Sequence, residues 1–238
     1  MATWLAHLRV AEILTAHFSF HKTDFFAGSV APDCGIPVPS GFDPPKEVTH
    51  WTSRGKGHCE YDRFYSEMIA GKSLDDSTLS FLMGYYCHLI ADVLWVRLIN
   101  EPCKEQNHEL YLSDRRVKPE WYANDHLYLK GHPDNSAFRR FCGISEYPVT
   151  CLPYYKRDYV ERQIHNIQQF YLHPPEYSAD FHYLTPAMMQ NWVERAAALI
   201  IEQLVSLGWP RNYPGGSAIR FIFRKVMKKS YSTSWRAS

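Results

Sequence analysis

Two polar residues interrupt an otherwise apolar segment, Phe81 to Val96. They are His88 and Asp92, and their four-residue spacing places both side chains on one face of a helix. A carboxylate inside a protein core is costly unless another group compensates its charge. Hydrogen bonding between the two side chains would do so, and so would a divalent metal ion, which such a pair commonly binds. The pair alone favours neither explanation, although Gly84, one turn earlier, leaves room for another group to approach.

Three further residues with ligand chemistry precede this pair in the chain. His7 lies on the apolar face of a helix predicted over Thr3–Phe18, where a lone histidine is usually a core residue. Asp33 follows a proline in FFAGSVAPDC, a position where aspartate often only forms a turn. His50 lies in THW, where packing is an equally ordinary role. None of the three identifies a site by itself.

Taken in chain order, these residues resemble the ligand pattern of the zinc-dependent phospholipase C and P1-type nuclease superfamily. The segments FFAGSVAPD, THW and FLMGYYCHLIADVLW are similar to its cytoplasmic phospholipase C-like branch, and the resemblance covers residues 1 to about 100. It implies an all-helical fold with a cluster of up to three zinc ions that hydrolyses phosphodiesters. By this resemblance Asp33, His50, His88 and Asp92 form one complete zinc site. His7 then binds a second ion, which Asp92 bridges to the first.

The chain also departs from the secreted enzymes of this superfamily. Leu98 stands where they have a further histidine, and no His-x-x-x-Glu or His-x-x-x-Asp pair follows residue 92. His58 and Asp62 have this spacing but come too early in the chain, where a solvated surface is the better explanation. The secreted enzymes also use the amine of a processed N-terminus as a ligand, and this sequence shows no processing signal. The departures predict one or two zinc ions rather than three.

Asp125 and His126 are candidates for the missing ligand. They lie in PEWYANDHLYLKG, whose aromatic residues indicate partial burial, and the stretch resembles a downstream motif of the cytoplasmic branch. We therefore include both among the predicted metal ligands, which are His7, Asp33, His50, His88, Asp92, Asp125 and His126. An exposed pair near the end of a helix explains these two residues equally well.

The resemblance implies a metal-dependent phosphoester hydrolase that attacks a phosphodiester or phospholipid with a zinc-bound hydroxide. The alternative is a non-catalytic helical protein in which one closed zinc site serves stability or partner binding. A coordination position held by water would indicate the enzyme, and four protein ligands would indicate the scaffold. The sequence contains no GxSxG turn, no P-loop and no HExxH motif, so no other catalytic signature competes.

The elements that must position these residues are mostly helices. Apolar spacing, caps and prolines predict helices over Thr3–Phe18, Glu60–Ala70, Ser73–Asn100 with Ser73 as N-cap, Pro119–Gly131, Tyr155–Tyr171, Thr185–Gly208 and Ser217–Lys229. The proline-rich stretch Gly28–Pro45 is predicted to be a long ordered loop. Because strand patterns are scarce, residues 1–238 are predicted to form a single compact all-α domain with long loops.

Composition restricts the partners and the compartment. The 26 Lys and Arg residues nearly balance the 25 Asp and Glu residues, which argues against nucleic acid as the main partner. No secretory signal and no uncharged apolar span is evident, and the six cysteines lack a CxxC spacing. We therefore expect reduced thiols in a cytoplasmic protein.

The C-terminal segment 217–229 mixes basic and apolar residues and could rest on an anionic bilayer. A helix packed by its apolar side, with a solvated basic edge, is the better explanation. The expected partner is thus a small-molecule or lipid phosphoester, and the oligomeric state is left open.

Overall fold

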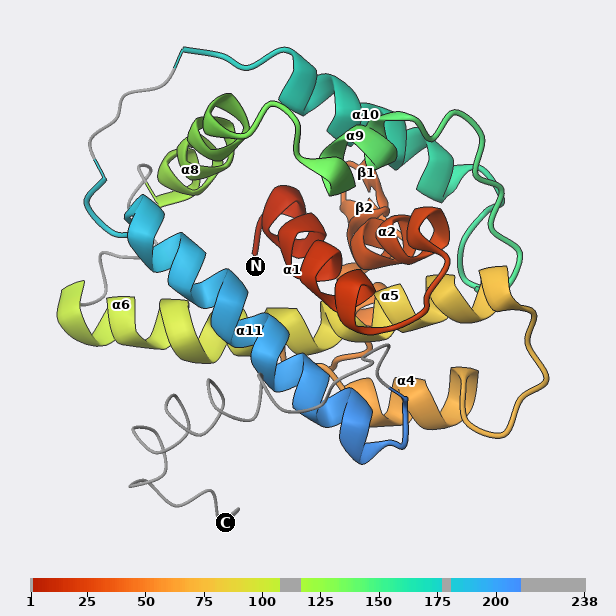
Figure 1. Cartoon of the computed structure of the whole chain (residues 1–238). Coiled ribbons are helices and arrows are strands. Elements are labelled where there is room, and N and C mark those ends of the chain that lie inside the picture. The colour runs from red at the N-terminus through yellow and green to blue at the C-terminus, as the bar shows by residue number, and fades with distance from the viewer. Residues whose placement is uncertain (1, 108–116, 177–180, 211–238) are drawn as a thin grey trace.

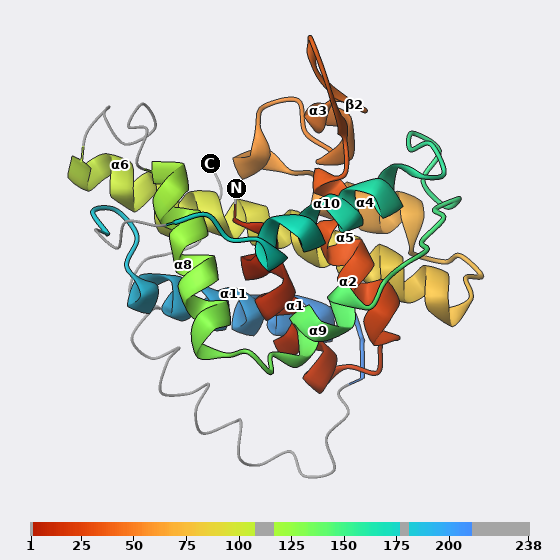
Figure 2. The ribbon, with the colours of Figure 1, turned by 90° about the horizontal axis from the view of Figure 1, so that it is seen from above.

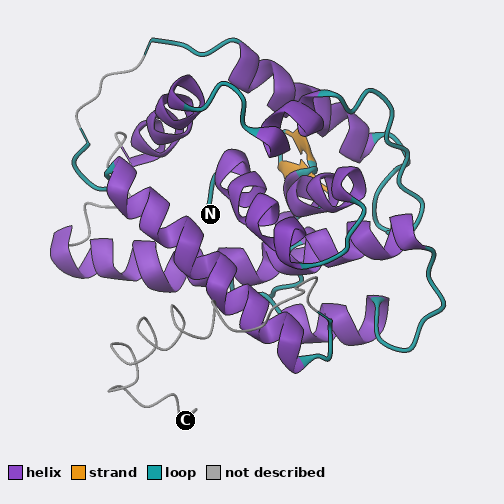
Figure 3. Cartoon of the chain, viewed as in Figure 1, coloured by secondary structure: helices purple, strands orange, loops and turns teal. Residues whose placement is uncertain are grey.

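The computed structural model describes residues 2–107, 117–176 and 181–210, and its regular structure is almost entirely helical (Figures 1 and 3). The helices are α1 (Trp4–His17), α2 (Lys22–Val30), α3 (Lys46–Thr49), α4 (Tyr61–Met68), α5 (Asp76–Trp95), α6 (Glu101–Asn107), α8 (Val117–Gly131), α9 (Ser136–Cys142), α10 (Tyr159–Leu172) and α11 (Pro186–Ser206). The strands β1 (Ile36–Val38) and β2 (Gly41–Asp43) form a small antiparallel hairpin. The predicted all-α class is therefore confirmed, whereas the single domain over residues 1–238 stays a prediction.

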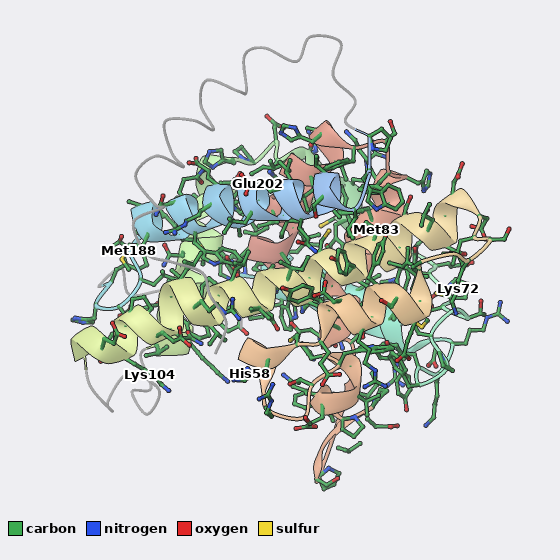
Figure 4. The ribbon with its side chains drawn as sticks, turned by 90° about the horizontal axis from the view of Figure 1, so that it is seen from below. His58, Lys72, Met83, Lys104, Met188 and Glu202 are labelled. Atoms are coloured by element: carbon green, nitrogen blue, oxygen red, sulfur yellow. The ribbon has the colours of Figure 1, made fainter. Side chains whose placement is uncertain are left out.

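Helix α5 forms the centre of the structure, because every residue from Ser80 to Trp95 is buried. Figure 4 shows it between α11 and α4, with Met83 on its central turns. Its N-cap is Asp75, whose side chain accepts a hydrogen bond from the amide of Thr78, so the prediction of Ser73 as N-cap is wrong. In the described part of the chain, only the continuous helix Asp76–Glu105 is long and apolar enough to cross a membrane, and 89% of its apolar window is buried, as expected of a core helix.

Helices α2 and α5 cross with their backbones in contact. A Cβ atom on Gly28 would lie 2.0 Å from the carbonyl oxygen of Phe81, and one on Gly84 would lie 2.2 Å from that of Phe25. Only glycine permits so close an approach at both positions. Helix α2 thus occupies the space predicted beside Gly84. The chain continues directly from α2 into the turn that contains Asp33.

The region predicted as a loop, Gly28–Pro45, is more regular than expected. Its first residues complete α2, a 3-10 turn follows at Ala31–Asp33, and the β1–β2 hairpin comes next. Strands of three residues are too short to show alternation in the sequence, and α2 draws its stability from its contact with α5 rather than from its own pattern. Figure 2 shows the hairpin and α3 projecting beyond the helical body.

The other predicted helices that fall within the described residues are found with shifted ends. Helix α5 passes through a π-helical turn at Val96–Asn100 into α6, so the helical path runs beyond the predicted end at Asn100. Thr185 caps α11 through a hydrogen bond from Met188, as predicted. The predicted helix Ser217–Lys229, with its basic residues, lies outside the described residues. All six cysteines are described, and none of them forms a disulfide there.

Candidate metal centre

Five of the predicted ligands converge in the core from four separate elements. His7 comes from α1, Asp33 ends the 3-10 turn after α2, His50 follows α3 directly, and His88 and Asp92 come from α5. Their side chains are buried, and Asp33, the most accessible of them, is only 7% exposed. His88 and Asp92 share one face of α5, as predicted, and the other three residues approach this face.

Asp92 lies between the histidines. Its Oδ1 atom is 3.5 Å from Nε2 of His7, whereas its Oδ2 atom is 3.4 Å from Nε2 of His50 and 3.7 Å from Nε2 of His88. Asp33 approaches from the other side, with Oδ1 3.4 Å from Nε2 of His50. The two oxygens of Asp92 thus face different imidazoles.

The ligand atoms form two groups that share His88. One group is His7, His88 and Asp92, the other is Asp33, His50 and His88, and within each group the possible ligand atoms lie within 4.8 Å of one another. The rings of His7 and His88 stack with centroids 3.7 Å apart and planes 11° from parallel. Three imidazoles and two carboxylates at this spacing are a donor set suited to zinc.

Two buried histidine nitrogens indicate whether a cation fits between these side chains. Nε2 of His7 and Nε2 of His88 have no hydrogen-bond partner in the protein. A buried polar atom left in this state costs about 1–3 kcal/mol, and such atoms in a folded protein call for an explanation. A cation beside them and the carboxylate of Asp92 would satisfy both nitrogens and compensate the buried negative charge.

The protonation state of His7 agrees with this role. Burial, together with the neighbouring His88, lowers the pKa of His7 from 6.5 to about 4. At neutral pH the ring is therefore uncharged, which is the form that binds a metal through a nitrogen lone pair.

Two other contacts orient the remaining imidazoles. Nδ1 of His88 lies 2.8 Å from the carbonyl oxygen of Ser29 in α2 and donates its proton there. Nδ1 of His50 lies 3.1 Å from the carbonyl oxygen of Lys46 in α3. With the proton held on Nδ1, each Nε2 atom presents a lone pair to the centre. The contact of α2 with α5 through Gly84 is what brings the carbonyl of Ser29 within reach.

A chain of aromatic hydroxyls and an indole supports the backbone beside His50. Tyr85, three residues before His88, donates to the carbonyl oxygen of Thr49. Tyr154 donates to the Tyr85 hydroxyl over 3.0 Å, and the indole of Trp51 donates to Tyr154 over 3.2 Å. These residues were not predictable as part of the site, because their hydrogen-bond partners lie far away along the chain. The one signal in the sequence was a tyrosine within the same apolar segment as His88.

Asp125 and His126 lie outside both groups of possible ligands among the described residues. Asp125 is fully buried, and its two oxygens accept hydrogen bonds from the hydroxyls of Thr3 (2.8 Å) and Tyr171 (2.6 Å). His126 is 8% exposed and packs against the rings of Phe170 and Tyr171. The alternative of an exposed pair is therefore wrong. Asp125 already has hydrogen-bond donors, and a metal role for either residue stays a prediction.

The other sequence candidates behave as expected. His58 and Asp62 are exposed, in agreement with a solvated surface, and His58 ends the short 3-10 turn Lys56–His58 that precedes α4 (Figure 4). Leu98, which stands where the secreted enzymes have a further histidine, packs against the hydrophobic core.

Comparison with known proteins adds one finding to this geometry. No curated protein and no solved structure matches the chain. The family model of zinc-dependent phospholipase C, in contrast, matches residues 4–129, a span that contains all five residues of the centre. Since this match covers more than half of the sequence, the chain belongs to the zinc-dependent phospholipase C family.

Proposed function

We propose that His7, Asp33, His50, His88 and Asp92 hold zinc, and that the protein hydrolyses a phosphodiester or phospholipid. The family implies a zinc-dependent hydrolase of the phospholipase C type, and the buried cluster supplies a donor set for the metal. Bound zinc lowers the pKa of water to about 7 and stabilises negative charge on a phosphoryl group. The cytoplasmic branch and a cytoplasmic location are part of the proposal.

The observation that carries the proposal is the position of Asp92. One of its oxygens faces His7, and the other faces His50 and His88. A carboxylate so placed can bridge two ions, one held with Asp33, His50 and His88, the other with His7. This supports a site of up to two zinc ions. A third ion lacks a described ligand group of its own.

The role of the protein is to keep His7 uncharged and to hold the three imidazoles in the right orientation. Ser29 and Lys46 fix the Nδ1 protons of His88 and His50, and burial keeps His7 uncharged. These contacts orient the Nε2 atoms before any ion binds, which reduces the reorganisation that binding requires.

One observation favours the scaffold function instead. The five side chains are all buried, and the void that touches His7 and His88 measures about 10 Å³, room for one water molecule at most. A closed centre of this kind fits a zinc ion that only stabilises the fold. The substrate must then reach the centre by a movement of the covering segments, or the protein is not an enzyme.

The two functions are separated by metal analysis combined with an activity assay. We expect the purified protein to contain zinc or to take it up in titration, and to hydrolyse an aryl phosphodiester until a chelator is added. Zinc should restore the activity. Asp92→Asn should lose both properties, whereas Asp62→Asn, which changes an exposed acid, should lose neither.

The possible negative results differ in meaning. Zinc bound without hydrolysis of aryl phosphates, phospholipids or nucleotides would favour the scaffold. If neither the purified nor the titrated protein binds metal, the centre itself is refuted.

A further inference from the structure

The β1–β2 hairpin ends in an exposed and uncharged tip. Residues 37–42 are all exposed, and no charged residue occurs between Cys34 and Asp43. Val38 and Phe42 are each 37% exposed, which places them among the large apolar side chains that face solvent. Figure 2 shows that this tip is the outermost part of the segment that projects from the helical body.

At its tip the hairpin has apolar side chains on both faces. Pro37 pairs with Phe42 across the strands, so their side chains share one face, and Val38 lies on the other. Asp43 pairs with Ile36 on that second face, at the base of the hairpin. A hairpin that packs on its own protein usually has one apolar and one polar face. Apolar side chains on both faces of a projecting tip suit apolar surroundings that enclose the tip.

The charged side chains nearest the tip belong to residues outside it, at the base of the hairpin and on α3. Lys46 holds its ammonium group 4.4 Å from the centre of the Phe42 ring. Asp43 accepts a hydrogen bond from Tyr159 over 2.7 Å and pairs with Lys156 at 3.5 Å, which offsets its negative charge. Glu47 is exposed on α3 beside Val48, which is itself 42% exposed. An uncharged apolar tip with charged residues of both signs at its base, among them two lysines, suits a peripheral membrane anchor.

The hairpin is also joined directly to the metal centre. The chain enters it from Asp33 and leaves it through α3 to His50. A surface that holds the tip therefore lies on the side of the protein from which two of the five residues reach the centre.

We infer that the hairpin tip inserts into the interface of a phospholipid bilayer. The inference rests on the proposed function, since it assigns that centre a substrate presented at a membrane surface. A protein partner is the poorer explanation, because a stable protein interface needs roughly 20–30 residues on each side. The six exposed residues of the tip supply far fewer.

The test is cosedimentation of the full chain with phosphatidylcholine vesicles, with and without phosphatidylserine. The tip variant is Val38→Asp combined with Phe42→Asp. Its control is Leu172→Asp, which makes the same kind of change at a side chain that is 52% exposed on α10. We expect the tip variant to partition roughly tenfold less onto vesicles, because two charges replace two inserted apolar groups. The control should bind as the original chain does.

Hydrolysis of a soluble aryl phosphodiester separates this inference from the proposed function. If the original chain hydrolyses the ester but does not bind vesicles, the bilayer inference is wrong and the hydrolase stands. If it binds vesicles through the tip without hydrolysing the ester, the inference stands and the hydrolase fails. Equal loss of vesicle binding in the tip variant and in Leu172→Asp would also overturn the inference. Circular dichroism of each variant would check that it is folded.

Discussion

Helix α1 contacts two buried acidic clusters of different character. Near its N-terminus, Thr3 and Tyr171 each donate a hydrogen bond to Asp125, and their hydroxyls in turn accept from backbone amides of α1. One turn further on, His7 faces Asp92 with a nitrogen that has no hydrogen-bond partner. The first cluster supplies hydrogen-bond donors to its acid, whereas in the second a histidine nitrogen without a hydrogen-bond partner faces the acid. A buried acid beside a histidine thus suits a metal site where the nitrogen of that histidine has no other partner.

The largest difference between the clusters should appear when each acid becomes its amide. Asp92→Asn removes a charged oxygen from the centre, and we expect the zinc affinity to fall by more than about 100-fold. Loss of a residue that only orients a ligand typically lowers the affinity by about 10- to 100-fold. Asp125→Asn should leave the zinc affinity unchanged where Asp125 only accepts hydrogen bonds from Thr3 and Tyr171, and a weaker affinity would show that Asp125 is a ligand, as the sequence predicts. Calorimetric titration measures both.

Melting temperatures give an independent check of this prediction. A chelator should lower the melting temperature of the original chain and of Asp125→Asn, because zinc stabilises the folded state by mass action. It should have little effect on Asp92→Asn. If Asp92→Asn binds zinc as tightly as the original chain, Asp92 is a core residue and the two-ion arrangement is refuted.

The second largest effect concerns the glycine that lets α2 approach α5. Gly84→Ala would place a Cβ atom 2.2 Å from the carbonyl oxygen of Phe25, so α2 must move and the Ser29 carbonyl must move with it. We expect a loss of about 3 kcal/mol in unfolding free energy, together with weaker zinc binding. Urea denaturation and zinc titration measure these losses.

Gly131, at the end of the helix that carries Asp125, provides the matched control. A Cβ atom there would meet nothing within 4 Å, so Gly131→Ala should have almost no effect on stability. Similar losses in the two variants would show that the contact of α2 with α5 does not support the centre.

The clusters should also respond to pH in opposite directions in the metal-free protein. The lowered pKa of His7, about 4, means that the unfolded chain takes up a proton below pH 6.5 and the folded chain does not, so stability falls as the pH falls from about 6.5 to 4. Burial raises the pKa of Asp125 to about 7. The folded chain then keeps a proton that the unfolded chain loses, so stability falls as the pH rises from about 4 to 7.

These two slopes oppose each other between pH 4 and 6.5, and a variant separates them. Asp125→Asn should make the free energy of unfolding rise more steeply with pH, by about 1.4 kcal/mol per pH unit. Urea denaturation in the presence of chelator at several pH values measures this slope. Parallel slopes for the variant and the original chain would contradict the assignment.

The smallest effect concerns two tyrosine hydroxyls. Tyr171→Phe removes a donor from Asp125 and should cost about 1–3 kcal/mol of stability without changing zinc affinity. Tyr85→Phe removes the donor to the backbone beside His50 and should weaken zinc binding about tenfold. An exchange of these outcomes would show that the two clusters are coupled through α1.

The sequence predicted the structural features that depend on residues close together in the chain, such as helical spacing and helix caps. The four-residue spacing of His88 and Asp92 predicted their shared face, and Thr185 before a proline predicted the start of α11. The close crossing at Gly84 was not predictable, because a glycine in a helix does not reveal which backbone it contacts. The donors to Asp125 were missed for a similar reason, since Thr3 and Tyr171 are distant from it in the sequence.

The resemblance provided what spacing could not, namely that His7, Asp33 and His50 reach the same place as the helix pair. Their convergence depends on tertiary packing, which no single segment contains. The ligand role of these residues, and of Asp125 and His126, stays a prediction until metal is measured.

The path of the chain between Asp33 and His50 gives zinc a second physical effect. This excursion contains the hairpin and α3, and both of its ends lie in the metal centre. An ion held by both residues would close the excursion into a ring in the folded protein, and it would oppose local opening of the hairpin and α3. Zinc would then act as a removable cross-link in a protein without disulfides among its described cysteines. Its removal would make the hairpin the first segment that a protease cuts.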